Sequence, residues 1–324
     1  MKAIRVREFG PPDVLRVEDV EIPAPAEGEV LVAVEVAGLS YGDVIVRSGR
    51  YPFPLPYVPG LEVGGRVVAA GPGTDPALVG ARVVAATVGM SGGYAEFAVA
   101  EAVNAHRVPE ALGLDTAVAV AQSGALAIGM LAAIAPRPGE SVLVTAAAGR
   151  IGSLLVQRAG VLGAGTVIGA VGGGEKAAAA REFGADVVVD YTDADWAAQV
   201  REATAGRGAD VVLDAVGGDT AVQALAATAD GGGRFGLYGF TSGRWAELDP
   251  LAIAGRGLAV IGVLGIVFAK PAAEQRADVA LALAEAAAGR LVPRVHASFP
   301  LERAADAHAA VEGRANVGAV LIAP

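Results

Sequence analysis

Apolar positions follow two different patterns along this chain, and the change between them lies near residue 114. In the first third, short Val-rich segments are separated by Pro and Gly, which is typical of the strands of a small barrel or sandwich. The segments concerned are 2–7, 15–20, 29–37 and 64–70. The pattern therefore predicts a β-rich domain at the start of the chain.

Beyond residue 114 the pattern is that of helices and buried strands. Residues 114–134 are apolar at helical spacing and predict a helix that ends before Pro136. Val-rich strands and Ala-rich helices then alternate, which indicates βαβ units in a doubly wound parallel sheet of the α/β class. The predicted strands are 141–145, 166–171, 186–190, 210–214, 234–238 and 258–263, and the predicted helices are about 150–162, 174–183, 193–204 and 219–228.

The tail of the chain returns to a mixed pattern. It predicts a helix at about 274–289, a strand, a second helix at about 301–312 and a closing strand, VGAVLI. We expect this tail to fold back onto the N-terminal domain, which makes that domain discontinuous. The predicted division is a β-rich domain of 1–117 and 267–324 and a dinucleotide-binding domain of 118–266, and 324 residues suffice for two such cores.

Composition narrows the classes of partner and of chemistry. The net charge of −10 argues against nucleic acid, whose binding depends on Lys and Arg at the phosphates. Cysteine is absent, which excludes disulfides, thiolate zinc sites and cysteine nucleophiles. The N-terminus lacks the apolar core of a signal peptide, and the apolar run at 257–269 is shorter than the roughly 20 residues of a membrane helix. We therefore expect a cytoplasmic protein with no membrane or nucleic-acid partner.

The strongest local motif is SVLVTAAAGRIGSLLVQRAG, in which a predicted strand runs through a turn into a helix. Glycine in such a turn lets the backbone approach a pyrophosphate, and the helix N-terminus presents free N–H groups to it. The first glycine of the usual GxGxxG motif is Ala here, so the position of the motif between strand and helix carries the assignment. The predicted dinucleotide-binding residues in this motif are Ala146, Gly149, Arg150, Ile151 and Gly152.

The end of the next predicted strand bears on which dinucleotide is bound. An NAD site usually has Asp or Glu there, hydrogen-bonded to the ribose hydroxyls. Here TVIGAV runs into Gly172 without a carboxylate, and Lys176 follows closely. This favours the 2′-phosphate of NADPH, with NADH less favoured. Two alternatives stay open: Glu175 could accept the ribose hydroxyls, and Lys176 could be an ordinary solvated lysine.

Several segments together resemble the zinc-free medium-chain reductases of the quinone oxidoreductase, or zeta-crystallin-like, family. The most specific are AGLSYGDVIVRSGRYPFPLPYVPGLEVGG and AAAGRIGSLLVQRAG, and the resemblance extends over essentially the whole chain. It implies a discontinuous GroES-like domain and a Rossmann domain, with the active site between them. It also implies a homodimer in which the last Rossmann strands, here LAVIGV, pair edge to edge.

The same resemblance assigns further residues. It implies that Lys176, Tyr191 and Arg314 meet the adenosine phosphate. Gly172 and Gly239 are further expected cofactor-binding residues. Two cations and a phenol form a composition that suits a phosphomonoester. The zinc ligands of metal-dependent relatives have no counterparts, because Ser40 lies near the place of a catalytic cysteine and Leu61 replaces a histidine. We therefore expect no metal.

Two departures from the family pattern concern the nicotinamide end of the site. Ser40 stands where many members have Asn, and Leu126 stands where a nicotinamide-contacting Thr is common. Both positions bear on how substrate and nicotinamide are oriented.

Tyr51 and Ser40 are the candidate catalytic residues. A phenol is protonated at neutral pH and can donate to an enolate, and in the related enoyl-thioester reductases a tyrosine at the place of Tyr51 is the proposed proton donor. Ser40 could hydrogen-bond the substrate or the nicotinamide ribose, while Tyr51 could instead simply pack against the Pro-rich loop. Asp43 and Arg47, at i and i+4 of a short helix, are expected to form an ion pair. The histidines are expected to be structural and hydrogen-bonded, and Asp214 to hydrogen-bond the local backbone.

These inferences lead to an NADPH-dependent reductase that transfers hydride to a small-molecule quinone or α,β-unsaturated carbonyl without zinc. Two other interpretations remain. One is an enoyl-thioester or pathway-specific enone reductase of specialised metabolism, and the other is a non-catalytic NADPH-binding protein.

Overall fold

The computed structural model describes all 324 residues, and the chain divides into two compact units. Unit 1 comprises Met1–Gln122, Leu283–Ala288 and Val292–Pro324, so it contains both ends of the chain. Unit 2 comprises Ser123–Ala282 and Gly289–Leu291. The chain passes from unit 1 into unit 2 within helix α2 (Leu114–Ile134), which has the predicted bounds.

Unit 2 is built on a six-stranded parallel sheet with the order β12-β11-β10-β7-β8-β9. The first strand of the series, β7, therefore lies in the middle, as in the Rossmann fold. The strands are β7 (Ser141–Thr145), β8 (Thr166–Val171), β9 (Val187–Asp190), β10 (Val211–Asp214), β11 (Arg234–Leu237) and β12 (Ala259–Ile261). The predicted α/β class and doubly wound sheet are confirmed.

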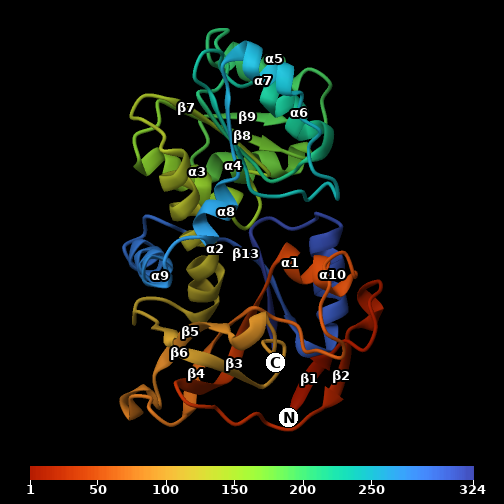
Figure 1. The fold of residues 1–324 in the computed structure, drawn as a ribbon, viewed down its shortest axis with the longest axis vertical. Helices are drawn as coiled ribbons and strands as arrows, with labels where there is room; N and C mark the ends of the chain where they lie inside the picture. Colours follow the sequence, from red (N-terminus) through yellow and green to blue (C-terminus); the bar gives the residue numbers. More distant parts are fainter. The chain divides into compact units, whose positions relative to one another are not determined.

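Helices pack on both faces of this sheet (Figure 1). They are α3 (Gly152–Val161), α4 (Ala177–Glu182), α5 (Trp196–Ala203) and α6 (Gly218–Ala226). Ile168 and Ala170 of β8 belong to one apolar cluster with Trp196 of α5 and Leu225 of α6. Gly169 between them faces the opposite side, where a Cβ would meet Ala180 of α4 at 3.5 Å. A helix-covered parallel sheet buries both faces, which explains the unbroken apolar runs in its strands.

The apolar stretch at 257–269 is not one continuous strand. It contains β12, which is only three residues long, and α8 (Val263–Phe268), and it follows α7 (Pro250–Arg256). Helix α7 begins after Asp249, whose side chain accepts the backbone N–H of Leu251, and ends at Gly257 in the left-handed conformation. The sequence analysis missed α7 and α8 because helices of one or two turns leave little periodicity to read.

Unit 1 contains a second six-stranded sheet with the order β13-β14-β3-β4-β5-β6, in which β3 also pairs with β6. That extra pairing closes β3 to β6 into a small barrel. The strands are β3 (Glu29–Leu39), β4 (Glu62–Ala70), β5 (Arg82–Thr87), β6 (Phe97–Arg107), β13 (Val295–Pro300) and β14 (Ala319–Ala323), and β1 (Lys2–Arg5) pairs separately with β2 (Arg16–Asp19). Strands β5 and β6 were not predicted.

The C-terminal segment completes unit 1. After α9 (Ala272–Ala287) come β13, the 3-10 turn η5 (Leu301–Arg303), α10 (Ala304–Glu312) and β14. Strand β14 pairs antiparallel with β3, with Val320 opposite Leu39. The end of the chain therefore adds two strands to the sheet formed by the N-terminal part, and the β-rich part is discontinuous.

Helix α2 is the one helix long and apolar enough to cross a membrane by length and composition. Of its most apolar window, 78% is buried inside the protein. Its apolar surface is thus used in packing, as in the core helix of many folded proteins.

Candidate functional site

The turn after β7 has the geometry of a tight strand-to-helix connection. Ala146 lies in the left-handed region with φ 51°, and the Gly149 N–H donates to the Ala146 carbonyl at 2.8 Å. A Cβ at Gly152 would clash with the Ala146 carbonyl oxygen and lie 3.1 Å from Ala147 Cα. Because these neighbours are backbone atoms, only glycine lets α3 start this close to the turn.

The position of this turn in the sheet is that of a ligand site. Strand β7 has β8 on one side and β10 on the other, so the chain order reverses between β7 and β10. In open α/β sheets, ligands bind at such a point, outside the carboxyl ends of the strands. The residues predicted from the motif therefore lie at the edge of the sheet where ligands bind in folds of this kind, and their binding of a dinucleotide stays a prediction.

The end of β8 brings two further predicted residues together. A Cβ at Gly172 would lie 2.6 Å from the Tyr191 hydroxyl oxygen, so the phenol rests against the bare backbone of Gly172. Lys176 ends the 3-10 turn η4 (Gly174–Lys176) on the same loop and is half-buried. Cofactor residues predicted from separate segments are thus neighbours here.

A carboxylate does lie near this loop, but its Oδ1 is engaged locally. Asp190 Oδ1 accepts the N–H of Gly173 at 3.0 Å, the N–H of Thr192 at 2.9 Å and the hydroxyl of Thr192 at 2.7 Å. Burial alone would raise its pKa, but these hydrogen bonds hold the pKa of Asp190 below its ordinary value. Asp190 therefore stays ionised and fixes the shape of the Gly172–Gly173 turn. The sequence analysis did not single it out.

The loops after β10 and β11 complete this edge of the sheet. A Cβ at Gly239 would lie 2.8 Å from the Ala215 carbonyl oxygen, and the same oxygen accepts the Thr241 N–H at 3.0 Å. Asp214, the last residue of β10, is fully buried and accepts the N–H groups of Val216 and Gly217. The expectation that Asp214 hydrogen-bonds local backbone is confirmed.

The remaining predicted residues belong to unit 1. Arg314 follows α10 in the left-handed region with φ 53° and is exposed. Tyr51 lies in the loop after α1 (Tyr41–Arg47), with 53% of its surface exposed and no hydrogen bond to the protein. The assignments of Arg314 to the adenosine phosphate and of Tyr51 to catalysis stay predictions.

Ser40 is part of a capping box at the start of α1. Its hydroxyl donates to Asp43 Oδ2 at 2.7 Å, its backbone N–H donates to the same oxygen at 2.9 Å, and its hydroxyl oxygen accepts the Asp43 N–H at 3.3 Å. The Ser40 proton is thus directed at Asp43, and a substrate would have to compete for it or use the hydroxyl as an acceptor.

The predicted ion pair between Asp43 and Arg47 is wrong. Arg47 is fully buried, with Nη2 2.7 Å from Glu312 Oε2 of α10 and Nη1 donating to the Gly10 carbonyl at 2.8 Å. Asp43 instead caps α1. Burial raises the pKa of Asp43 to about 6, against the hydrogen bonds from Ser40 and Gly60 and with the help of nearby Glu62. The spacing i, i+4 is compatible with the predicted pair, but Arg47 pairs instead with Glu312, which lies 265 residues away in the sequence.

The family models matched by the chain fit both units. An alcohol dehydrogenase GroES-like domain matches residues 26–110, and a zinc-binding dehydrogenase domain matches residues 151–284. Quinone oxidoreductase of Rattus norvegicus is 32% identical over 318 residues, covering 95% of this chain and 93% of the relative. The chain belongs to the quinone oxidoreductase family.

Two further proteins are similar to this chain over its full length. 2-Haloacrylate reductase of a Burkholderia species is 33% identical over 339 residues, with 98% of each chain covered. The crystal structure of Escherichia coli quinone oxidoreductase complexed with NADPH superimposes with a TM-score of 0.92 at 30% identity and covers all of both chains. The predicted pairing of a GroES-like domain with a Rossmann domain is confirmed.

Metal ligands in this quinone oxidoreductase family member do not cluster, despite the zinc-binding name of the matching domain. No group of three or more His, Cys, Asp or Glu side chains is placed to hold a metal ion. His296 Nδ1 accepts the Val317 N–H at 3.4 Å. His308 is fully buried with its ring edge-on to Tyr94, and neither ring nitrogen has a hydrogen-bond partner. The expectation that each histidine is hydrogen-bonded is thus wrong for His308.

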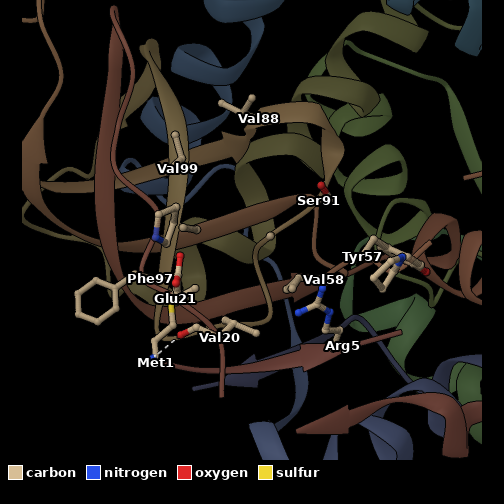
Figure 2. Close-up of a pocket in the computed structure, with 14 residues that line it drawn as sticks. Met1, Arg5, Val20, Glu21, Tyr57, Val58, Val88, Ser91, Phe97 and Val99 are labelled. Atoms are coloured by element: carbon tan, nitrogen blue, oxygen red, sulfur yellow. Dashed lines mark hydrogen bonds between the residues drawn. The ribbon is translucent and has the colours of Figure 1, made fainter. Parts of the chain in front are cut away.

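A cavity of about 350 Å³ opens in unit 1 (Figure 2). Its lining is mostly apolar and includes Val58, Val88 and Phe97, with Arg5 and Glu21 as its charged members. Neither Tyr51 nor Ser40 lines it. The cavity and the predicted catalytic residues are therefore separate features of unit 1.

Proposed function

We propose that this protein is an NADPH-dependent reductase that transfers hydride to quinones or α,β-unsaturated carbonyls without a metal. The observation that carries the proposal is the end of β8, where Gly172 has no side chain, the Tyr191 phenol rests on it and Lys176 stands on the same loop. A ribose 2′-phosphate needs such room together with a cation and a hydroxyl donor. The relative solved with NADPH supports this choice of cofactor.

The residues of the chain would divide the work as follows. NADPH supplies the hydride, so the protein has to bind, orient and stabilise charge. The turn from Ala146 to Gly152 and the first N–H groups of α3 would hold the pyrophosphate. Lys176, Tyr191 and Arg314 would hold the 2′-phosphate. Tyr51, exposed and without a partner in the protein, would donate its hydroxyl proton to the oxygen or carbon that gains charge.

The two classes of substrate have support from different relatives. The rat protein is named for quinones, and the Burkholderia protein is named for 2-haloacrylate, a carbon–carbon double bond conjugated to a carboxylate. An enone or enoyl thioester shares that conjugated geometry. The second similarity favours conjugated double bonds as an alternative substrate class to quinones.

We also propose a homodimer through the edge of the unit 2 sheet. Strand β12 is an edge strand, its residues Ala259, Val260 and Ile261 are all apolar, and each is at least partly exposed. An unprotected apolar edge is suited to pairing with a second copy. Analytical ultracentrifugation tests this, and Val260→Pro, which removes one N–H from the edge, should shift the protein toward the monomer.

The test of the function is an NADPH oxidation assay with quinones, enones and enoyl thioesters, run on the native protein and on Tyr51→Phe. We expect turnover of at least one class, and a fall in kcat of about 10²-fold in Tyr51→Phe on an enone. On a quinone the fall should be smaller, because water can supply both protons after hydride transfer. Binding of NADPH without turnover of any class would favour the non-catalytic alternative, and absence of NADPH binding would overturn the proposal.

A further inference from the structure

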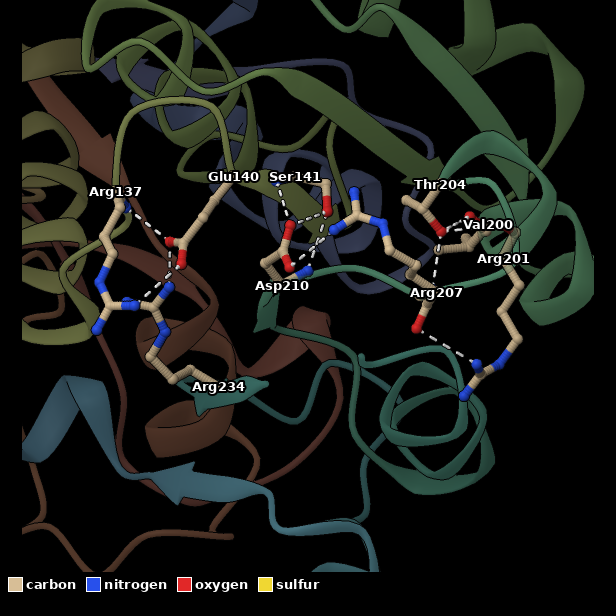
Figure 3. Close-up of polar contacts among 10 residues, drawn as sticks. Arg137, Glu140, Ser141, Val200, Arg201, Thr204, Arg207, Asp210 and Arg234 are labelled. Carbon is tan, nitrogen blue, oxygen red and sulfur yellow. Dashed lines mark hydrogen bonds and ion pairs between the residues drawn. The ribbon is translucent and has the colours of Figure 1, made fainter. Parts of the chain in front are cut away.

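Two hydroxyl–carboxylate pairs of the same kind connect β7 to the β10 segment, one to Asp210 directly before β10 and one to Asp214 at its end. At the N-terminal end, the Ser141 hydroxyl donates to Asp210 Oδ2 at 2.7 Å (Figure 3). At the C-terminal end, the Thr145 hydroxyl donates to Asp214 Oδ1 at 2.7 Å. Ser141 and Thr145 are the first and last residues of β7, so one strand carries both pairs.

The surroundings of the two pairs differ. Thr145 and Asp214 are both fully buried, so neither side chain can touch a ligand directly. Asp210 is only partly buried and has Arg207 3.9 Å away at the surface. Ser141 is buried, so only the aspartate of this pair reaches the surface, at the end of the sheet opposite the candidate cofactor site.

The Thr145–Asp214 pair is the centre of a network that reaches both loops at the reversal of strand order. Thr145 Oγ1 also accepts the Ala215 N–H at 3.0 Å, and Asp214 Oδ2 accepts the Gly217 N–H at 2.9 Å. Thr145 is followed directly by Ala146, which is held in the left-handed conformation. Ala146 begins the turn from Ala146 to Gly152, called here the pyrophosphate turn. A non-glycine residue persists in that conformation only where the surrounding structure over-determines it.

The network continues to the loop after β11. The Asp214 carbonyl accepts the Tyr238 N–H at 3.0 Å, and the Val216 carbonyl accepts the Ser242 N–H at 2.8 Å. The carboxylate thus holds the end of β7 and the loop after β10 directly, and backbone hydrogen bonds connect the loop after β11 to them. Burial raises the pKa of Asp214, and its three hydrogen-bond donors act in the opposite direction.

We propose that Thr145 and Asp214 are positioning residues that hold the pyrophosphate turn in its binding conformation, whereas the Ser141–Asp210 pair holds the same two strands together without affecting the cofactor. The proposal rests on the proposed dinucleotide-binding function of this turn. The two pairs share donor type, acceptor type and strands, so the chain supplies its own control.

The test compares Thr145→Val with Ser141→Ala. Each substitution removes one hydroxyl donated to an aspartate, and each should lower the melting temperature. Only Thr145→Val should raise the Kd for NADPH, by at least about tenfold, or about 1.4 kcal/mol. It should raise the Kd for NADH by the same factor, because the pyrophosphate is common to both. Thr145→Ser keeps the hydroxyl and should restore binding.

Titration of NADPH and NADH by fluorescence provides the affinities. If the native protein binds neither dinucleotide, the proposed function fails before the inference is reached. If the native protein binds and Thr145→Val changes Kd no more than Ser141→Ala does, the positioning role is wrong. Should Thr145→Val not fold, Asp214→Asn and Asp210→Asn decide in the same way, with the selective loss expected for Asp214→Asn alone.

Discussion

The two units bury their polar side chains in different ways. In unit 2 the buried polar groups are mostly hydroxyls bonded to nearby backbone: Thr204 donates to the Val200 carbonyl at 3.0 Å, and Thr228 to the Ala224 carbonyl at 3.0 Å. The one fully buried carboxylate there, Asp214, has three donors. In unit 1 the buried polar groups are mainly ionisable. They are Asp43, Arg47, Glu62, Glu285 and His308, together with Thr87.

Several of the buried groups in unit 1 also lack partners. Arg47 Nε, the Tyr57 hydroxyl and both ring nitrogens of His308 have no hydrogen bond, although all are buried. In unit 2 the Tyr238 hydroxyl is in the same condition. An unpaired buried polar group costs about 1–3 kcal/mol, whereas a satisfied one costs little and selects one conformation.

This contrast indicates how the stability of each unit should respond to substitutions and to pH. In unit 2 most buried polar side chains are neutral hydroxyls, and the carboxylates that hold the loops at the ligand edge, Asp190 and Asp214, each accept several hydrogen bonds. The ionisable core of unit 1 makes its stability depend on single charge partners and on pH. Substitutions in the two cores should therefore have effects on stability that differ in magnitude and in pH dependence.

The largest effect is expected for Glu312→Ala in unit 1. Glu312 is the carboxylate partner of Arg47, and its removal leaves a fully buried guanidinium with the Gly10 carbonyl as its remaining acceptor. Breaking a fully buried pair costs about 3–5 kcal/mol, and because the Glu312 side chain is 35% exposed we expect a loss of about 3 kcal/mol. Chemical denaturation measures the change in the free energy of unfolding.

The matched control is Arg50→Ala, because Arg50 is exposed and lies 4.0 Å from the other oxygen of Glu312. An exposed pair contributes at most about 1 kcal/mol. Equal losses in Glu312→Ala and Arg50→Ala would show that the buried arginine does not depend on its partner.

In unit 2 the largest effect is expected for Gly152→Ala, which is steric. The new methyl group would overlap the Ala146 carbonyl and the Ala147 backbone, so the turn or the start of α3 must move. Overpacking of this kind costs about 1–3 kcal/mol, and NADPH binding should be lost with it. Gly160→Ala in the same helix is the control, because a Cβ there meets nothing within 4 Å. It should leave binding intact, and loss of binding in both variants would point to the helix rather than the turn.

A pH-dependent effect is expected from His308 and Asp43 with opposite signs. Burial, and then the charge of Arg47, lower the pKa of His308 to about 3 from an ordinary 6.5. Between pH 6.5 and 3 the histidine is protonated in the unfolded state but neutral in the folded state. The contribution of the neutral, buried His308 to the free energy of unfolding is therefore present above pH 6.5 and is lost as the pH falls toward 3. Asp43, with its pKa raised to about 6, takes up a proton in the folded state first, so its contribution rises as the pH falls from 6 to 4.

Denaturation of His308→Leu and Asp43→Asn between pH 4 and 6 separates these contributions. Relative to the native protein, His308→Leu should gain stability with falling pH and Asp43→Asn should lose it, each by up to about 1.4 kcal/mol per pH unit. Parallel pH profiles for the three proteins would contradict the assignment of pH sensitivity to this core.

The sequence allowed most of unit 2 to be predicted, and the reason is physical. Strands β7 and β8 have the predicted bounds, because parallel strands buried on both faces read as unbroken apolar runs between Gly-rich turns. Strands β5 and β6 were missed. In β6, FAVAEAVNAHR mixes Ala with charged and amide residues, so alternation is weak, and its pairing with β3 depends on residues far away in sequence.

The same distinction between local and long-range features applies to the polar contacts described above. The tight turn at Gly152 and the strand end without a carboxylate at Gly172 could be inferred from the sequence because both are local features, while their part in cofactor binding stays a prediction. The partner of Arg47 could not, because Glu312 lies 265 residues away and the helical spacing suggested Asp43 instead. The Thr145–Asp214 hydrogen bond could not be predicted from the sequence either, because it forms only when β7 and β10 are neighbours in the sheet.

A smaller effect, on selectivity rather than stability, is expected for Lys176→Ala. If Lys176 meets the 2′-phosphate, its loss should weaken NADPH by about tenfold and leave NADH nearly unchanged, so the ratio of the two Kd values reports the role. This distinguishes it from Thr145→Val, which should weaken both alike. Fluorescence titration with both dinucleotides measures the ratio. An unchanged ratio would return Lys176 to an ordinary surface lysine.

The smallest effect is expected for Ala146→Gly, and it should have the opposite sign. Ala146 stands in the left-handed region, where an L residue costs about 1–2 kcal/mol relative to glycine. Glycine also loses more conformational freedom on folding, by about 0.4–1 kcal/mol, so a net gain in stability between zero and about 1.6 kcal/mol remains. Ala147→Gly is the comparison, because Ala147 is fully buried and has no such strain; it should lose about 1 kcal/mol through its missing methyl group. If both variants lose stability equally, the left-handed turn carries no strain. The preference of the fold for glycine at the first position of the motif would then need another explanation than backbone conformation.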